Sequence, residues 1–165
     1  MNELYNACNL CPRKCHINRN LTTGVCNNTS SIKVARSALH YFEEPSISGS
    51  NGSGTIFFSG CNLKCCYCQN KEISTNNFGI NISIKRLSEL MLDLQSKGAN
   101  NINLVTPTHF VPSIIEAIKL ARKNGLTIPI VYNTSGYENV DTIKLLDGYV
   151  DIYLTDFKYF NDKLG

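Results

Sequence analysis

The feature that most restricts the fold is a regular alternation of two hydrophobic patterns that begins at residue 55. Short apolar runs rich in β-branched and aromatic residues, which favour strands, alternate with longer segments whose apolar residues recur at helical spacing. Strands are expected at residues 55–59, 102–106, 128–132 and 151–154, and helices at residues 83–97, 112–124 and 140–146. Repeated strand–helix–strand units place the strands parallel through right-handed crossovers. The sequence therefore predicts an α/β fold with about four parallel strands.

The first 50 residues lack this periodicity and contain four of the eight cysteines, with one expected strand at residues 31–36. The stretch SISGSNGSG that follows is typical of a loop or linker. We therefore expect two parts, a cysteine-rich metal-binding segment at residues 1–50 and the α/β part at residues 51–165.

The charge and hydropathy of the chain disfavour several classes of partner. The net charge is only +3 and the Lys and Arg residues are not clustered, so we expect no nucleic-acid partner and no membrane partner. No signal peptide is recognisable at the start, and no apolar stretch is long enough to span a membrane. We therefore expect a cytoplasmic protein, in which grouped cysteines more often bind metal than form disulfides.

Polar or metal-binding residues follow all four expected parallel strands, in the segments GCNLKCCYCQN, PTHFVP, NTSGY and TDFKY. Ligands of parallel α/β folds bind at the carboxyl ends of the strands. Loops are polar in most proteins, so the middle two segments are a weaker indication than the first and last. The sequence predicts a functional site at this edge of the sheet.

Three cysteines of the first segment, Cys61, Cys65 and Cys68, have C-x3-C-x2-C spacing. Closed zinc sites usually take four protein ligands, whereas three ligands leave a coordination position open. Thiolates also suit iron–sulfur clusters, so we expect a [4Fe–4S] cluster with one iron free to bind a small molecule. Adjacent side chains diverge, so Cys66 is expected to pack as a small apolar residue. The alternative, four purely structural thiols, is disfavoured by their density.

This cysteine motif, placed directly after a strand and with the aromatic Tyr67 before its last cysteine, resembles the radical S-adenosylmethionine (SAM) superfamily. The resemblance implies a partial (β/α) radical SAM barrel and an oxidoreductase that cleaves SAM reductively to a 5′-deoxyadenosyl radical. The segments CNLCPRKC, GSGTIFFSGCNLKCCYCQN, NINLVTPTHFVP, PIVYNTSGY and DIYLTDFKY together resemble the PflX-type homologues of pyruvate formate-lyase activating enzyme. That resemblance implies an electron donor such as flavodoxin or ferredoxin, and either a glycyl-radical protein or a small molecule as target.

The resemblance also carries candidate SAM contacts onto this chain. Tyr67 matches an aromatic position near the adenine, and Asn133 stands in place of the acid of an Asp-Thr-Asn-Gly segment. Asp156 and Lys158 match an Asp-x-Lys motif that touches SAM and substrate. A second argument does not use the resemblance. Side chains alternate along a strand, so Asp156 and Lys158 share one face with the apolar Leu154. We therefore expect both charges at the barrel mouth.

Thr106, Thr108 and His109 stand where activating enzymes have a Gly-Gly-Glu segment that receives the amino group of SAM. Thr106 and Thr108 are therefore candidate SAM contacts at an altered position. His109 is expected to be either a contact or a hydrogen-bonded scaffold residue. No protein side chain is assigned to the catalytic step itself.

The remaining cysteines, Cys8, Cys11, Cys15 and Cys26, have gaps of two, three and ten residues. This spacing differs from the bacterial ferredoxin run and suits a four-thiolate zinc site about as well as an auxiliary iron–sulfur cluster. Either group would stabilise a segment too short and polar for a core of its own. We expect a second metal here and leave its identity open.

The superfamily barrel normally has six strands, and only four are expected here. We therefore expect the chain to be the N-terminal part of a longer enzyme, truncated at its C-terminus. Two alternatives stay open: a non-catalytic zinc or iron–sulfur binding module, and an inactive fragment that still holds its cluster.

Overall fold

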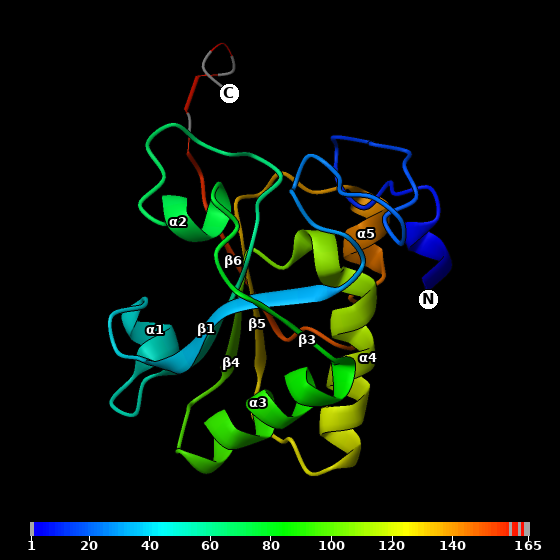
Figure 1. Cartoon of the computed structure of the whole chain (residues 1–165). Helices are drawn as coiled ribbons and strands as arrows, with labels where there is room; N and C mark the ends of the chain where they lie inside the picture. The colour runs from blue at the N-terminus through cyan, green and yellow to red at the C-terminus, as the bar shows by residue number, and fades with distance from the viewer. Residues whose placement is uncertain (1, 159, 162, 164–165) are drawn as a thin grey trace.

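The computed structural model describes residues 2–158, 160–161 and 163. Within them, six strands form one sheet in the order β3-β1-β2-β4-β5-β6 (Figure 1). The strands are β1 (Ile32–His40), β2 (Ser53–Phe58), β3 (Ile80–Ile82), β4 (Ile102–Val105), β5 (Ile130–Thr134) and β6 (Ile152–Thr155). Strands β2, β4, β5 and β6 run parallel, whereas β1 pairs antiparallel with both β2 and β3.

The predicted α/β fold is present, but its sheet is mixed rather than all parallel. All four expected parallel strands form, and the antiparallel strands β1 and β3 are added at one edge. β1 extends to His40, four residues beyond the expected end. Strand β3 was not expected because it is three residues long, lies partly exposed and is held by pairing with β1. In the described part of the chain the sheet is open, with β3 and β6 as its edges.

Two long helices, α3 (Ile84–Ser96) and α4 (Val111–Lys123), cover one face of the sheet. The Ser83 hydroxyl caps α3 by accepting a 3.0 Å hydrogen bond from the backbone N–H of Arg86, and a proline in the first turn starts α4. Their apolar sides pack on the strands through Leu87, Met91, Leu94, Ile114, Ile118 and Ala121. The short helices are α1 (Pro45–Ser48), α2 (Lys71–Ser74) and α5 (Val140–Lys144), with 3-10 turns at η1 (Asn2–Tyr5) and η2 (Thr108–Phe110).

The strand register defines the opposite, inner face of the sheet. One row across it contains Thr55, Asn103, Val131 and Ile152, and the next row toward the carboxyl ends contains Phe57, Val105, Asn133 and Leu154. Arg36 of β1 pairs with Phe57 and therefore extends the second row. Because side chains alternate along a strand, these rows face away from α3 and α4.

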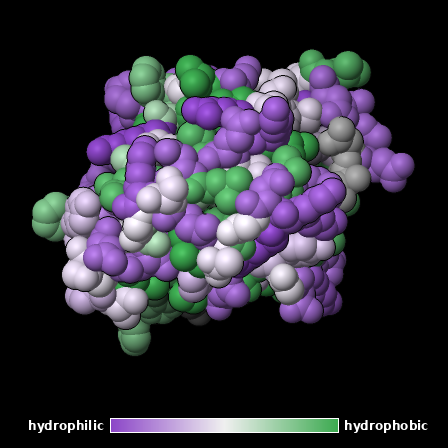
Figure 2. Space-filling model, turned by 90° about the horizontal axis from the view of Figure 1, so that it is seen from below, coloured by the Kyte–Doolittle hydropathy of each residue, from purple (hydrophilic) through white to green (hydrophobic). Residues whose placement is uncertain are grey.

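The two ends of the sheet differ in what covers them. In Figure 1 the cysteine-rich N-terminal segment and α2 lie at the end where the parallel strands finish. Figure 2 views the molecule from the other end, where hydrophilic and hydrophobic side chains are interspersed. Among the described residues, no helix combines the length and apolar character that crossing a membrane requires.

Candidate functional site

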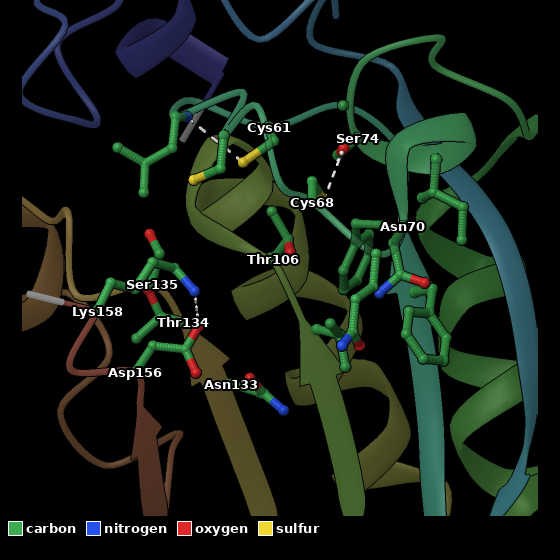
Figure 3. Close-up of a pocket in the computed structure, with 18 of the residues that line it drawn as sticks. Cys61, Cys68, Asn70, Ser74, Thr106, Asn133, Thr134, Ser135, Asp156 and Lys158 are labelled. Carbon is green, nitrogen blue, oxygen red and sulfur yellow. Dashed lines mark hydrogen bonds and ion pairs between the residues drawn. The ribbon is translucent and has the colours of Figure 1, made fainter.

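A cavity of about 680 Å³ lies over the carboxyl ends of the parallel strands. Its volume falls within the roughly 300–1,000 Å³ typical of small-molecule sites. Predicted site residues that line it are Cys61, Cys65, Tyr67, Cys68, Thr106, Asn133, Asp156 and Lys158. Figure 3 shows Cys61 and Cys68 on the loop above the strand ends, with Thr106 and Asn133 at the ends of β4 and β5. The topology thus gathers residues from four separate segments into one space.

The cysteine loop presents three free, half-buried thiols to this cavity. The backbone N–H of Leu63 donates to Cys61 Sγ at 3.4 Å, and the Ser74 hydroxyl lies 3.2 Å from Cys68 Sγ. Across residues 2–158, 160–161 and 163, no three His, Cys, Asp or Glu side chains are already arranged as ligands around one metal position. Three soft thiols on one short loop are nevertheless the donor set that an iron–sulfur cluster takes, so their chemistry fits that group. Their assignment as ligands stays a prediction.

The expectation that Cys66 packs as an apolar residue is wrong, because its side chain is exposed. It lies between Cys65 and Tyr67, which both line the cavity, and Tyr67 is 55% exposed. Neighbouring side chains on a tight loop diverge, so turning Cys65 and Cys68 toward the cavity leaves Cys66 in solvent.

Thr106 has an unusual backbone conformation at the cavity wall. Its φ is +57°, and a β-branched residue in the left-handed region is a genuine outlier that costs about 1–2 kcal/mol. Its N–H donates to the carbonyl of Asn133 at 3.0 Å, which ties the end of β4 to the end of β5. Strain of this kind is typical of binding sites, where the surrounding structure holds it in place.

Thr108 and His109, by contrast, do not line the cavity because the η2 turn directs them into the protein. The Thr108 hydroxyl donates to Glu138 Oε1 at 2.6 Å, and His109 Nε2 lies 2.8 Å from the carbonyl oxygen of Ser59. Burial, together with the positive charge of Arg19, lowers the pKa of His109 to about 3. Neutral His109 therefore donates its Nε2 proton to Ser59, as a scaffold residue does.

Asp156 and Lys158 form an ion pair at the cavity edge, just after β6. Burial alone would lower the pKa of Lys158, but its hydrogen bond to Asp156 and the negative charges of Asp156, Cys65 and Cys61 raise it above the ordinary value. Lys158 is thus a permanent cation whose field reaches the cysteine thiols. Figure 3 shows the pair beside Ser135, on the side of the cavity opposite α2.

Sequence reasoning missed two features of the site. Arg36 and His40 line the cavity from β1. Together with Ala38 they occupy every second position of this strand, which places all three on its inner face. An expected strand that continued to His40 would have included this pattern. Glu138 accepts hydrogen bonds from the hydroxyls of Thr108, Tyr132 and Thr134, and Thr134 itself lines the cavity. Burial raises the pKa of Glu138. A single glutamate in a polar loop carries no sequence signal for this role.

The first cysteine group lies outside the cavity. Cys8, Cys11 and Cys26 are buried and Cys15 is half-buried, all as free thiols. Burial raises the pKa of Cys11 and of Cys26, and the charges of Cys8 and Cys15 raise both further. The four thiols therefore share one neighbourhood. The division of the chain at residue 50 stays a prediction, although β1 already belongs to the sheet.

Comparisons with known proteins show which family the chain resembles. Residues 55–164 match the family described as the radical SAM superfamily. An uncharacterised protein of Methanocaldococcus jannaschii is 34% identical over an alignment of 172 positions, gaps included, which covers 99% of this chain and 48% of that protein. The chain therefore spans about half the length of this curated relative.

Proposed function

Because the chain belongs to the radical SAM superfamily, we propose that its cavity binds a [4Fe–4S] cluster through Cys61, Cys65 and Cys68, with SAM beside it. Members of this superfamily typically bind both groups. The observation that carries the proposal is the shared cavity, in which three free thiols face the polar residues that follow β4, β5 and β6. Reductive cleavage of SAM, and hence oxidoreductase activity, is the reaction that this arrangement supports best.

When bound, the cluster supplies one electron and an open iron position, and SAM supplies the 5′-deoxyadenosyl group that abstracts hydrogen. The chain's own contribution is to bind, orient and tune. Hydrogen-bond donors near Cys61 and Cys68 stabilise thiolate charge and raise a cluster's reduction potential. Lys158 adds a positive charge on the side of the cavity opposite α2, where it would attract the carboxylate of SAM.

The remaining cavity residues suit the other parts of SAM. The exposed ring of Tyr67 offers an apolar face to the adenine, and Asn133 offers both a donor and an acceptor. The backbone of Thr106, in its left-handed conformation, holds the end of β4 beside Asn133. Thr108 has its hydroxyl committed to Glu138, so in this proposal it acts by positioning the loop and does not contact SAM.

Metal analysis separates this function from its main rival, a non-catalytic zinc module. After anaerobic reconstitution, the proposal expects about four irons with matching acid-labile sulfide at the three-cysteine site. Zinc alone, with no sulfide, would favour the rival. The iron and sulfide content should fall in Cys65→Ala and stay unchanged in Cys66→Ala, because Cys65 lines the cavity and Cys66 does not.

Activity is tested by production of 5′-deoxyadenosine from SAM with dithionite as reductant. We expect turnover in the reconstituted protein and in Cys66→Ala, and none in Cys65→Ala. A protein that holds iron and sulfide but forms no 5′-deoxyadenosine would instead support an inactive cluster-binding fragment.

For the target, the PflX-type resemblance supports a glycyl-radical protein, and a small molecule is the second candidate. Flavodoxin or ferredoxin is the electron donor that fits this chemistry. A stable organic radical on an added glycyl-radical protein, formed only with SAM and reductant present, would support the first candidate.

A further inference from the structure

The N-terminal segment has little regular structure to hold it together. Within residues 2–31 the structure shows one 3-10 turn, and the buried cluster there consists of Tyr5, Cys8 and Leu10. The backbone hydrogen bonds that link distant parts of the segment include Cys8 N to Ile17 O at 2.9 Å, Arg19 N to Tyr5 O at 2.7 Å and Ser30 N to Arg19 O at 2.8 Å. A segment of this kind usually needs a disulfide or a metal, and all four of its thiols are free.

The four thiols lie near one another without yet meeting at one point. A Cβ placed on Gly24 would lie 3.6 Å from the sulfurs of both Cys15 and Cys26, so these two thiols border the same small space. The turns beside them are held in left-handed conformations, with φ of +43° at Lys14, +52° at His16 and +61° at Asn27. Non-glycine residues rarely adopt this conformation, and such strain gathers at ligand clamps.

A buried positive charge completes the neighbourhood. Arg19 is 1% exposed and donates hydrogen bonds to the carbonyls of Asn28, Thr29 and His109. Its Nη1 also lies 3.8 Å from Cys8 Sγ. Among the described residues no carboxylate pairs with Arg19. Four thiolates around a metal carry a net negative charge, which a buried guanidinium offsets.

The same segment holds the cysteine loop of the cavity. The Asn28 side chain donates to the carbonyls of Cys26 at 3.0 Å and Ser59 at 2.8 Å. Arg13 Nε donates to the carbonyl of Asn62 at 2.8 Å. Arg13 and Asn28, each two positions after Cys11 and Cys26 respectively, thus bind the chain on both sides of Cys61.

We propose that Cys8, Cys11, Cys15 and Cys26 form a four-thiolate metal centre that fixes the position of the Cys61–Cys68 loop. Zinc and an iron–sulfur cluster share this thiolate chemistry. The centre does not depend on the proposed SAM chemistry, and its tests use metal content and thiol reactivity rather than turnover.

The first experiment isolates the site by replacing Cys61, Cys65 and Cys68 with Ser in the full chain. Cobalt(II) added anaerobically to this variant should give the intense absorption of a four-thiolate centre. Zinc added afterwards should displace the cobalt, at one metal per chain. Iron with sulfide, used in a parallel sample, distinguishes a cluster from zinc. Absence of thiolate absorption with cobalt and of bound metal in both samples would overturn the proposal.

Alkylation of the wild-type chain provides a second measurement that needs no variant to fold. Bound metal should protect all four N-terminal cysteines from iodoacetamide, while the exposed Cys66 reacts at the same rate with and without metal. Equal alkylation rates of the N-terminal thiols with and without metal would overturn the proposed metal centre.

The coupling to the cavity is tested with Cys26→Ser, using Cys66→Ser as the matched control. Loss of the N-terminal metal should make Cys61 react about tenfold faster or more, because the loop that bears it opens more often. The control should leave the rate for Cys61 unchanged. An unchanged rate in Cys26→Ser would overturn the positioning role.

Discussion

Gly60 occupies the tightest point between the N-terminal segment and the cysteine loop. Its φ is +79°, and an added Cβ would lie 2.2 Å from the carbonyl oxygen of Cys26 and 2.1 Å from Asn28 Nδ2. Backbone atoms cannot move away cheaply, so Gly60→Ala should lower the free energy of unfolding by about 2–4 kcal/mol. Urea denaturation of both proteins measures this difference.

Gly148→Ala is the matched control, because its φ of +75° is similar and no atom lies within 4 Å of its added Cβ. It should cost only the strain of the left-handed conformation, about 1–2 kcal/mol. Equal losses in the two variants would mean that conformational strain alone, and not the contact with Cys26, makes glycine necessary at residue 60.

His109 makes stability depend on pH. Its pKa is lowered from 6.5 to about 3, so the unfolded chain takes up this proton at a higher pH than the folded chain does. The stabilisation is complete above the unfolded pKa and is lost as the pH falls from there toward the folded pKa. Between pH 6.5 and 5 the loss should reach about 2 kcal/mol.

The variant His109→Gln keeps a side-chain N–H donor for Ser59 but cannot titrate. Urea denaturation across this pH range should therefore show a flatter dependence in the variant than in the wild type. Parallel curves for the two proteins would contradict the assignment of His109 as a buried neutral residue.

The sequence predicted which residues lie together where the order of the parallel strands decides the outcome. Asn133 and Asp156 lie at or directly after their strands, so a parallel sheet necessarily brings them to one edge. Thr108 and His109 were less predictable because the η2 turn, which no periodic pattern marks, rotates both into the interior. Arg19 gave no signal, since its burial depends on contacts with segments far along the chain.

At the scale of elements, local start and stop signals made helices easier to predict than the added strands. α3 and α4 lie within one residue of their expected bounds, because a capping serine and an early proline mark where they begin. β1 and β3 depend instead on long-range antiparallel pairing. The short β3 has no alternating pattern long enough to recognise.

The cap on α3 yields a direct prediction. Ser83→Ala removes the hydroxyl that accepts from Arg86 N–H, and it should lower the free energy of unfolding by about 1 kcal/mol. Ser83→Asp restores a capping oxygen and should regain most of that loss in the same thermal or urea measurement. If both variants behaved like the wild type, the cap would not contribute to stability.

At the scale of the whole molecule, the sheet has one face covered by α3 and α4 and an inner face that borders the cavity at its carboxyl end. The cavity spans the ends of β2, β4, β5 and β6 and reaches Arg36 on β1. This chain corresponds to 48% of the length of the Methanocaldococcus jannaschii relative, and the sheet is open in the described residues. Closure into a barrel therefore stays a prediction, as does the cytoplasmic location.

The central claim is that three thiols hold a cluster whose remaining iron binds SAM. Its most direct test is the electron paramagnetic resonance spectrum of anoxically reconstituted, dithionite-reduced protein, recorded with and without SAM. The account predicts that SAM changes the spectrum of the wild type and of Cys66→Ala but leaves that of Cys65→Ala unchanged. Identical spectra with and without SAM, in protein that holds about four irons at this site, would contradict it.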